Sequence, residues 1–101
     1  MKNFIPYGRQ NIDKKDIIEV TKSLKKNLIT TGSYVKKFEI AFKSKIKSKF
    51  CIACSSGTAA LHLAFMSINV KKNDIVILPV INFVAASNIL KMLGAKIYFA
   101  D

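Results

Sequence analysis

The apolar positions in the first half of the chain recur at helical spacing. Asp13 is a good helix N-cap, and Asp16 completes an approximate capping box with it. A polar loop from residue 27 to 32 interrupts the pattern, and Ser33 can cap a second helix. We therefore predict two amphipathic helices with lysines on their outer faces. Their apolar stripes are Ile17, Val20, Thr21, Leu24 and Leu28 in the first, and Val35, Phe38, Ala41, Phe42 and Ile46 in the second.

The second half alternates short apolar runs with helical segments. Its strands are continuous apolar runs, which is typical of a parallel sheet covered on both faces. Gly94 suits the position just after a helix. The order β-α-β-α-β predicts an α/β fold with right-handed crossovers. The expected elements are strand 50–54, helix 58–68, strand 75–78 closed by Pro79, a helix from Asn82 or Phe83 to Met92, and strand 96–100.

These patterns divide the chain into two parts. Residues 1–49 are expected to form an arm with two helices, and residues 50–101 to begin a larger α/β domain. The helix 58–68 is apolar all round, and the chain stops directly after a strand. We therefore expect the sequence to be the front part of a larger enzyme.

The charge of +11 suggests an acidic partner, such as nucleic acid or a membrane surface. Sixteen of the seventeen basic residues are lysine, whereas nucleic-acid readers favour arginine. Because the lysines are spread over the two predicted helices, we interpret most of them as a solvated face. The sequence shows no signal peptide and no apolar run near the ~20 residues of a membrane span, so a cytoplasmic protein is expected.

Cys51 and Cys54 form a C-x-x-C pair within the first predicted strand. Residues three apart on a strand point to opposite faces, so these thiols are not expected to chelate one metal there. His62 is the only histidine, and there is no second cysteine pair. We expect two reduced core cysteines and no metal site.

Polar residues follow the predicted strands at the edge where parallel sheets bind ligands. Ser55–Thr58 combines a strand end, a glycine and a helix N-terminus, which can hold a phosphate or carboxylate. The hydroxyls of Ser56 and Thr58 would add donors, although Ser-Gly-Thr is equally an ordinary helix cap. Neither a Walker A loop nor G-x-G-x-x-G is present. Phe83 follows the next strand and could either pack the helix start or stack on a planar cofactor ring.

A co-linear set of segments carries a family resemblance. The segments are Ile5–Asp13 with Asp16 and Ile17, Ile29–Gly32, Phe38 and Glu39, Ser55–Leu63, Pro79–Asn88, Gly94 and Ala95, and Phe99–Asp101. Together they resemble the N-terminus of the DegT/StrS family of sugar aminotransferases, pyridoxal-phosphate (PLP) enzymes of fold type I. The likeness covers nearly all 101 residues, and the opening segment is most similar to the branch that aminates UDP-4-keto-6-deoxy-N-acetylhexosamines.

The resemblance implies roles for individual residues. Gly57 and Thr58, beside Ser56, match positions that hold the PLP phosphate, and Phe83 matches the aromatic that stacks on the PLP ring. Asn82 stands where the family usually has Thr or Ser, but it can still cap the following helix. Thr31 and Ser33 replace the usual Gln and Pro around Gly32. The positions that match the nucleotide-sugar site are Tyr7, Asn27, Leu28, Ile29 and Thr30.

The resemblance also implies that the catalytic residues lie beyond residue 101. The Schiff-base lysine is among them, so we expect these 101 residues alone to be inactive. The complete enzyme would convert the UDP-4-keto sugar to its 4-amino form with glutamate as donor, in the biosynthesis of surface polysaccharides such as those containing pseudaminic acid. It would be a homodimer that contacts neither nucleic acid nor membrane. The alternative is a small lysine-rich module that binds anions or RNA.

Overall fold

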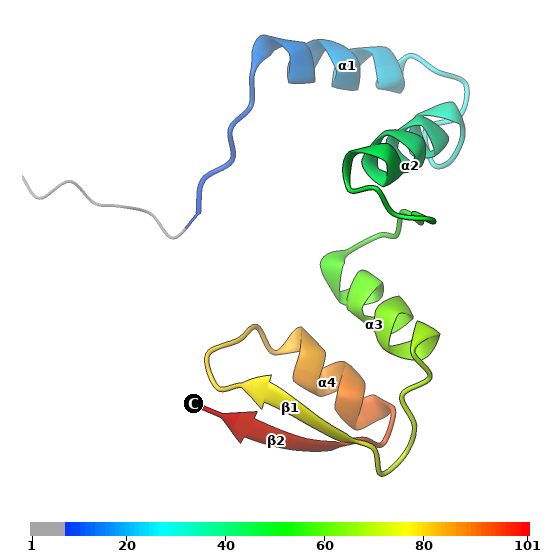
Figure 1. Ribbon diagram of the computed structural model, residues 1–101. Helices are drawn as coiled ribbons and strands as arrows, with labels where there is room; N and C mark the ends of the chain where they lie inside the picture. Colours follow the sequence, from blue (N-terminus) through cyan, green and yellow to red (C-terminus); the bar gives the residue numbers. More distant parts are fainter. Residues whose placement is uncertain (1–7) are drawn as a thin grey trace, which may run out of the picture. The chain divides into compact units, whose positions relative to one another are not determined.

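The computed structural model describes residues 8–101 (Figure 1). By its internal contacts the chain divides into two compact units, Met1–Cys51 and Ile52–Asp101. The expected boundary after residue 49 lies just before this division. The described elements are α1 (Lys14–Leu24), α2 (Ser33–Lys45), α3 (Gly57–Ser67), β1 (Ile75–Pro79), α4 (Ala85–Met92) and β2 (Lys96–Ala100).

Helix α1 begins with the capping box that the sequence predicts. Asp13 Oδ1 accepts hydrogen bonds from the backbone N–H groups of Lys15 at 2.7 Å and Asp16 at 3.0 Å, and Asp16 Oδ2 accepts from Asp13 N at 2.9 Å. The helix ends at Leu24, where Lys26 N bonds back to Ser23 O at 3.1 Å. The predicted apolar stripe extends beyond the end of the helix, because this tightened turn leaves Leu28 in the loop that follows.

Helix α2 has Gly32 as its N-cap, with no side-chain hydrogen bond, so the expectation that Ser33 caps it is wrong. Gly32 has φ +113°, a conformation that glycine adopts without a steric penalty, and the turn leaves Ser33 as the first helical residue. Within the helix, Phe38 and Phe42 lie one turn apart with their ring centroids 5.7 Å apart.

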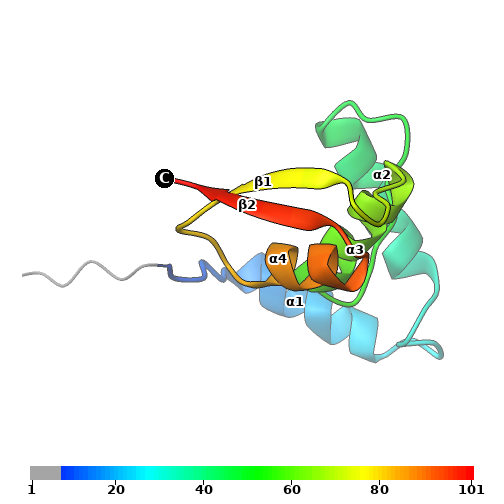
Figure 2. The same cartoon turned by 90° about the horizontal axis from the view of Figure 1, so that it is seen from below.

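In the second unit, β1 and β2 pair in parallel, with Val76 opposite Ile97 and Leu78 opposite Phe99. Helix α4 connects the two strands and lies along one face of the pair (Figures 1 and 2). It contacts both β2 and α3. The buried apolar side chains of the described residues all belong to α4: Ala85, Ala86, Ile89 and Leu90.

The fold class is therefore α/β, as the sequence predicts, but the first of the predicted strands does not form. Residues 50–54 form no strand, and among the described residues only β1 and β2 pair. A strand exists only with a hydrogen-bonding neighbour, and an apolar run does not supply that neighbour. The prediction of a sheet covered on both faces also fails here, because Ile77 and Tyr98 on the other face are exposed.

The cysteines are less buried than expected, and α3 is exposed as well. Cys51 is half-buried and Cys54 is exposed, both as free thiols, because the segment that holds them is not a core strand. Helix α3 has no buried residue, and Leu63 and Met66 on it are exposed. Among residues 8–101, no three His, Cys, Asp or Glu side chains gather as a metal site would need. None of the described helices has the length and apolar character to cross a membrane.

Candidate functional site

The N-terminus of α3 is capped by Ser56. Its hydroxyl oxygen accepts a hydrogen bond from Ala59 N at 3.1 Å, and its carbonyl accepts from Ala60 N at 3.0 Å. The N–H groups of Gly57 and Thr58 open the helix and have no intrahelical acceptor. The cap that the sequence predicts is thus present, and it leaves two backbone donors for a ligand.

The space in front of Gly57 is open. A Cβ built on this glycine would meet no atom of any other segment within 4 Å, so no neighbouring segment crowds the start of α3 at this residue. The Thr58 hydroxyl lies next to it in the chain, and the positive end of the helix dipole favours an anion at this point. The arrangement can hold a phosphate group through two backbone donors and one hydroxyl.

Phe83 lines the same cavity as Gly57 and Thr58. This cavity has a volume of about 640 Å³ and belongs entirely to the second unit. The two N–H groups of Gly57 and Thr58, with the Thr58 hydroxyl, are called the anion cradle below. The structure therefore brings this cradle and the predicted stacking aromatic, Phe83, to one cavity. The other residues that line the cavity are Ala60, Leu61, Ala64 and Ala85.

These four additional residues are not among the site residues predicted from the sequence. Gly57, Ala60, Leu61 and Ala64 recur every three or four residues and so share one face of α3. Their helical spacing was the available signal.

The loop before α4 differs from its prediction. The helix begins at Ala85, later than the expected Asn82 or Phe83, and its N-cap is Val84, which makes no side-chain cap bond. Asn82 therefore does not cap α4. Its Oδ1 instead accepts a hydrogen bond from Phe83 N at 2.7 Å, because the chain stays non-helical at these residues.

The electrostatics of this cavity come from backbone dipoles. None of its described lining residues carries a charge. The pKa of the Lys22 ammonium on α1 is raised, because it donates a hydrogen bond to Glu19 Oε1 at 2.6 Å and lies beside the opposite charge of that carboxylate. This exposed pair lies in the other unit and does not line the cavity.

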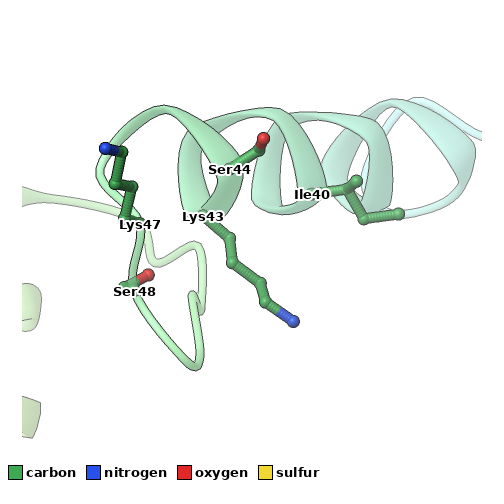
Figure 3. A pocket seen from close by; sticks show the side chains of 5 residues that line it. All are labelled: Ile40, Lys43, Ser44, Lys47 and Ser48. Carbon is green, nitrogen blue, oxygen red and sulfur yellow. The ribbon is translucent and has the colours of Figure 1, made fainter.

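A second cavity, in the first unit, is basic. It has a volume of about 370 Å³ and lies at the C-terminal end of α2 (Figure 3). In Figure 3 the ammonium groups of Lys43 and Lys47 point away from each other. They also lie at the negative end of the helix dipole, which they complement. The cavity is lined by Ile40, Lys43, Ser44, Lys47 and Ser48.

The predicted nucleotide-sugar residues lie apart in the chain from the cavity at Phe83. Tyr7 lies outside the described residues. Residues 27–30 form the exposed loop between α1 and α2, in the first unit. Their role in substrate binding stays a prediction.

Comparison with known proteins identifies the family. Residues 10–101 match the DegT/DnrJ/EryC1/StrS aminotransferase family, and the chain belongs to it. A relative with 38% identity over 97 residues is the UDP-4-amino-4,6-dideoxy-N-acetyl-beta-L-altrosamine transaminase of Campylobacter jejuni subsp. jejuni serotype O:23/36 (strain 81-176). The match covers 96% of this chain and 26% of that protein, so the chain spans about a quarter of its curated relative.

Solved structures show the same fold. Spr1654 from Streptococcus pneumoniae, in its PLP form, aligns with TM-score 0.82 and 29% identity over 96% of this chain and 25% of that one. The E. coli GDP-4-keto-6-deoxy-D-mannose-3-dehydratase with bound hydrated PLP aligns with TM-score 0.84 and 25% identity, over 95% and 26% of the two chains. The described fold thus matches about a quarter of the fold of solved sugar enzymes that bind PLP.

Proposed function

We propose that this chain is the cofactor-binding N-terminal part of a PLP-dependent nucleotide-sugar aminotransferase. The observation that supports this proposal best is the cavity that Gly57, Thr58 and Phe83 line together. Its donors suit a phosphate, and its apolar walls with an aromatic side chain suit a planar ring. The residues therefore fit pyridoxal phosphate.

In this proposal the chain's own residues bind and orient the cofactor. The N–H groups of Gly57 and Thr58 and the Thr58 hydroxyl hold the phosphate. Ser56 holds the helix N-terminus in the conformation that leaves these donors free. Phe83 covers one face of the ring and excludes water from it. Bound PLP supplies the electron sink on which amino-group transfer depends.

For the substrate, we propose a UDP-4-keto-6-deoxy-N-acetylhexosamine, with glutamate as amino donor. The name of the Campylobacter relative and the similarity of the opening segment to that branch support this choice. Tyr7 and residues 27–30 would line the nucleotide-sugar site. The complete enzyme would be a cytoplasmic homodimer that serves surface polysaccharide biosynthesis.

Cofactor binding can be tested on the 101-residue chain. PLP itself is a poor probe, because its aldehyde reacts with lysine side chains, of which the sequence has sixteen. Pyridoxine 5′-phosphate carries the same ring and phosphate without the aldehyde. In equilibrium dialysis followed by absorbance, we expect it to bind much more tightly than pyridoxine, which lacks the phosphate.

Two variants connect that binding to the cradle. Thr58→Val removes one hydroxyl donor to a charged group and is expected to weaken binding about ten-fold. Gly57→Val places a β-branched side chain in the open space beside the start of α3 and should weaken binding further. Ser67→Ala, at the other end of α3, removes a hydroxyl bonded to Ala64 O and serves as the control. Equal binding by wild type and both cradle variants would contradict the proposal.

A further inference from the structure

The loop between β1 and α4 has few hydrogen bonds of its own. At its start, Val80 N bonds to Ala100 O at 3.0 Å, and at its end Val84 O accepts from Asn88 N at 3.0 Å. Between these anchors, among the described residues, Phe83 N donates to Asn82 Oδ1 at 2.7 Å. The Asn82 side chain is therefore the group within the loop that holds the Phe83 N–H.

Packing does little to orient the same loop. Ile81 is 94% exposed and Phe83 is 76% exposed, so neighbouring side chains restrain them little. An exposed aromatic on an unrestrained backbone loses conformational entropy when it stacks on a ligand. A hydrogen bond that fixes the backbone before binding reduces that loss.

We propose that Asn82 is the positioning residue for the Phe83 ring. Its side-chain oxygen holds the Phe83 N–H group and so keeps the ring at the cavity of Gly57 and Thr58, ready to stack on a planar heteroaromatic ring that carries a phosphate. This role rests on the proposed function, because the ligand is the proposed cofactor. The competing explanation is that Asn82 only solvates an exposed loop.

Two substitutions at Asn82 separate these explanations. Asn82→Leu keeps the approximate size of the side chain but has no acceptor. Asn82→Asp keeps the acceptor oxygen in the same place. If Asn82 positions Phe83, Asn82→Asp should keep the protection of the Phe83 amide that Asn82→Leu loses. If Asn82 only solvates the loop, neither substitution should change exchange at the Phe83 amide.

The first measurement needs no ligand. Amide hydrogen exchange of Phe83, followed by NMR in the 101-residue chain, should be about five-fold faster in Asn82→Leu than in wild type, and close to wild type in Asn82→Asp. Contacts of the Phe83 ring protons with Gly57 and Thr58 should weaken in Asn82→Leu alone. Equal exchange rates in wild type and Asn82→Leu would overturn the proposal.

The second measurement uses two probes, pyridoxine 5′-phosphate and inorganic phosphate. Asn82→Leu should weaken pyridoxine 5′-phosphate binding about five-fold and leave phosphate binding unchanged, because only the former has a ring. When Phe83→Leu is already present, Asn82→Leu should cause no further loss of affinity for pyridoxine 5′-phosphate. Independent, additive losses in the double variant would overturn the proposal.

The two measurements also separate failure of this inference from failure of the proposed function. If wild type binds neither probe, the proposed function fails, and the ligand-free exchange experiment still decides whether Asn82 orients Phe83. If wild type binds both probes but Asn82→Leu binds pyridoxine 5′-phosphate as wild type does, only the positioning role fails.

Discussion

Gly94 combines two local requirements that glycine alone meets. It follows the C-cap of α4 with φ +79°, and it donates to Lys91 O while Ala95 donates to Leu90 O, which together form a Schellman motif. A Cβ at this residue would also lie 3.1 Å from Lys72 Cγ. The turn between α4 and β2 thus depends on the absence of a side chain.

Gly94→Ala should therefore destabilise the second unit. We expect the free energy of unfolding to fall by about 1–2 kcal/mol, because alanine disfavours the left-handed conformation, and by more if Lys72 cannot move. Urea unfolding followed by circular dichroism measures the change. Gly8→Ala, with no atom within 4 Å of its Cβ, is the control and should change stability by less than about 0.5 kcal/mol. Equal effects of the two substitutions would contradict this account of the turn.

At the scale of elements, α4 organises the second unit. It supplies Leu90, the side chain that is fully buried, and it contacts α3 on one side and β2 on another. Burial consequently alternates along β1, whereas on β2 Ile97 is half-buried and Phe99 is exposed. Along β1, Leu78 is half-buried while its neighbour Ile77 is 68% exposed.

Two substitutions to lysine on β1 test this assignment of faces. Leu78→Lys places a charge on the half-buried face and should lower the free energy of unfolding by about 2 kcal/mol. Ile77→Lys places the same charge on the exposed face and should change it by about 0.5 kcal/mol or less. Thermal unfolding of the 101-residue chain compares them directly. A greater loss in Ile77→Lys would show that the faces are reversed.

For the whole molecule, the main feature is the uneven distribution of charge. Residues 1–51 contain thirteen Lys and Arg against four Asp and Glu, whereas residues 52–101 contain four against two. The cavity that Phe83 lines lies in the nearly neutral unit and is lined by uncharged residues. The basic surface and the proposed cofactor site are therefore separate features of the chain.

This separation predicts different salt dependences for two kinds of ligand. Binding of a fluorescent RNA oligonucleotide, measured by anisotropy, should be lost between about 20 and 150 mM salt, because non-specific phosphate contacts are screened. Binding of pyridoxine 5′-phosphate should change by less than about two-fold, since backbone donors hold it. RNA binding that persists at about 150 mM salt would favour the alternative of a lysine-rich RNA-binding module.

Features fixed by neighbouring residues could be predicted from the sequence alone. Strand β2 spans Lys96–Ala100, the Asp13 capping box opens α1, and Gly94 follows the end of α4, as predicted. Each depends on contacts within about five residues, which a linear pattern contains. The cap at Ser56 and the two N–H groups that it leaves free are local features of the same kind.

Only the tertiary structure decided the features that depend on distant parts of the chain. Residues 50–54 have the composition of a strand but are not part of the sheet of the described residues, and α4 begins only after a loop in which Phe83 N donates to Asn82 Oδ1. Phe83 lies 25 residues or more from Thr58 and Gly57, and the packing of α4 against α3 brings all three to one cavity. The sequence determined which groups could hold a phosphate and a ring, and packing between elements decided that they meet, because such contacts depend on the whole unit.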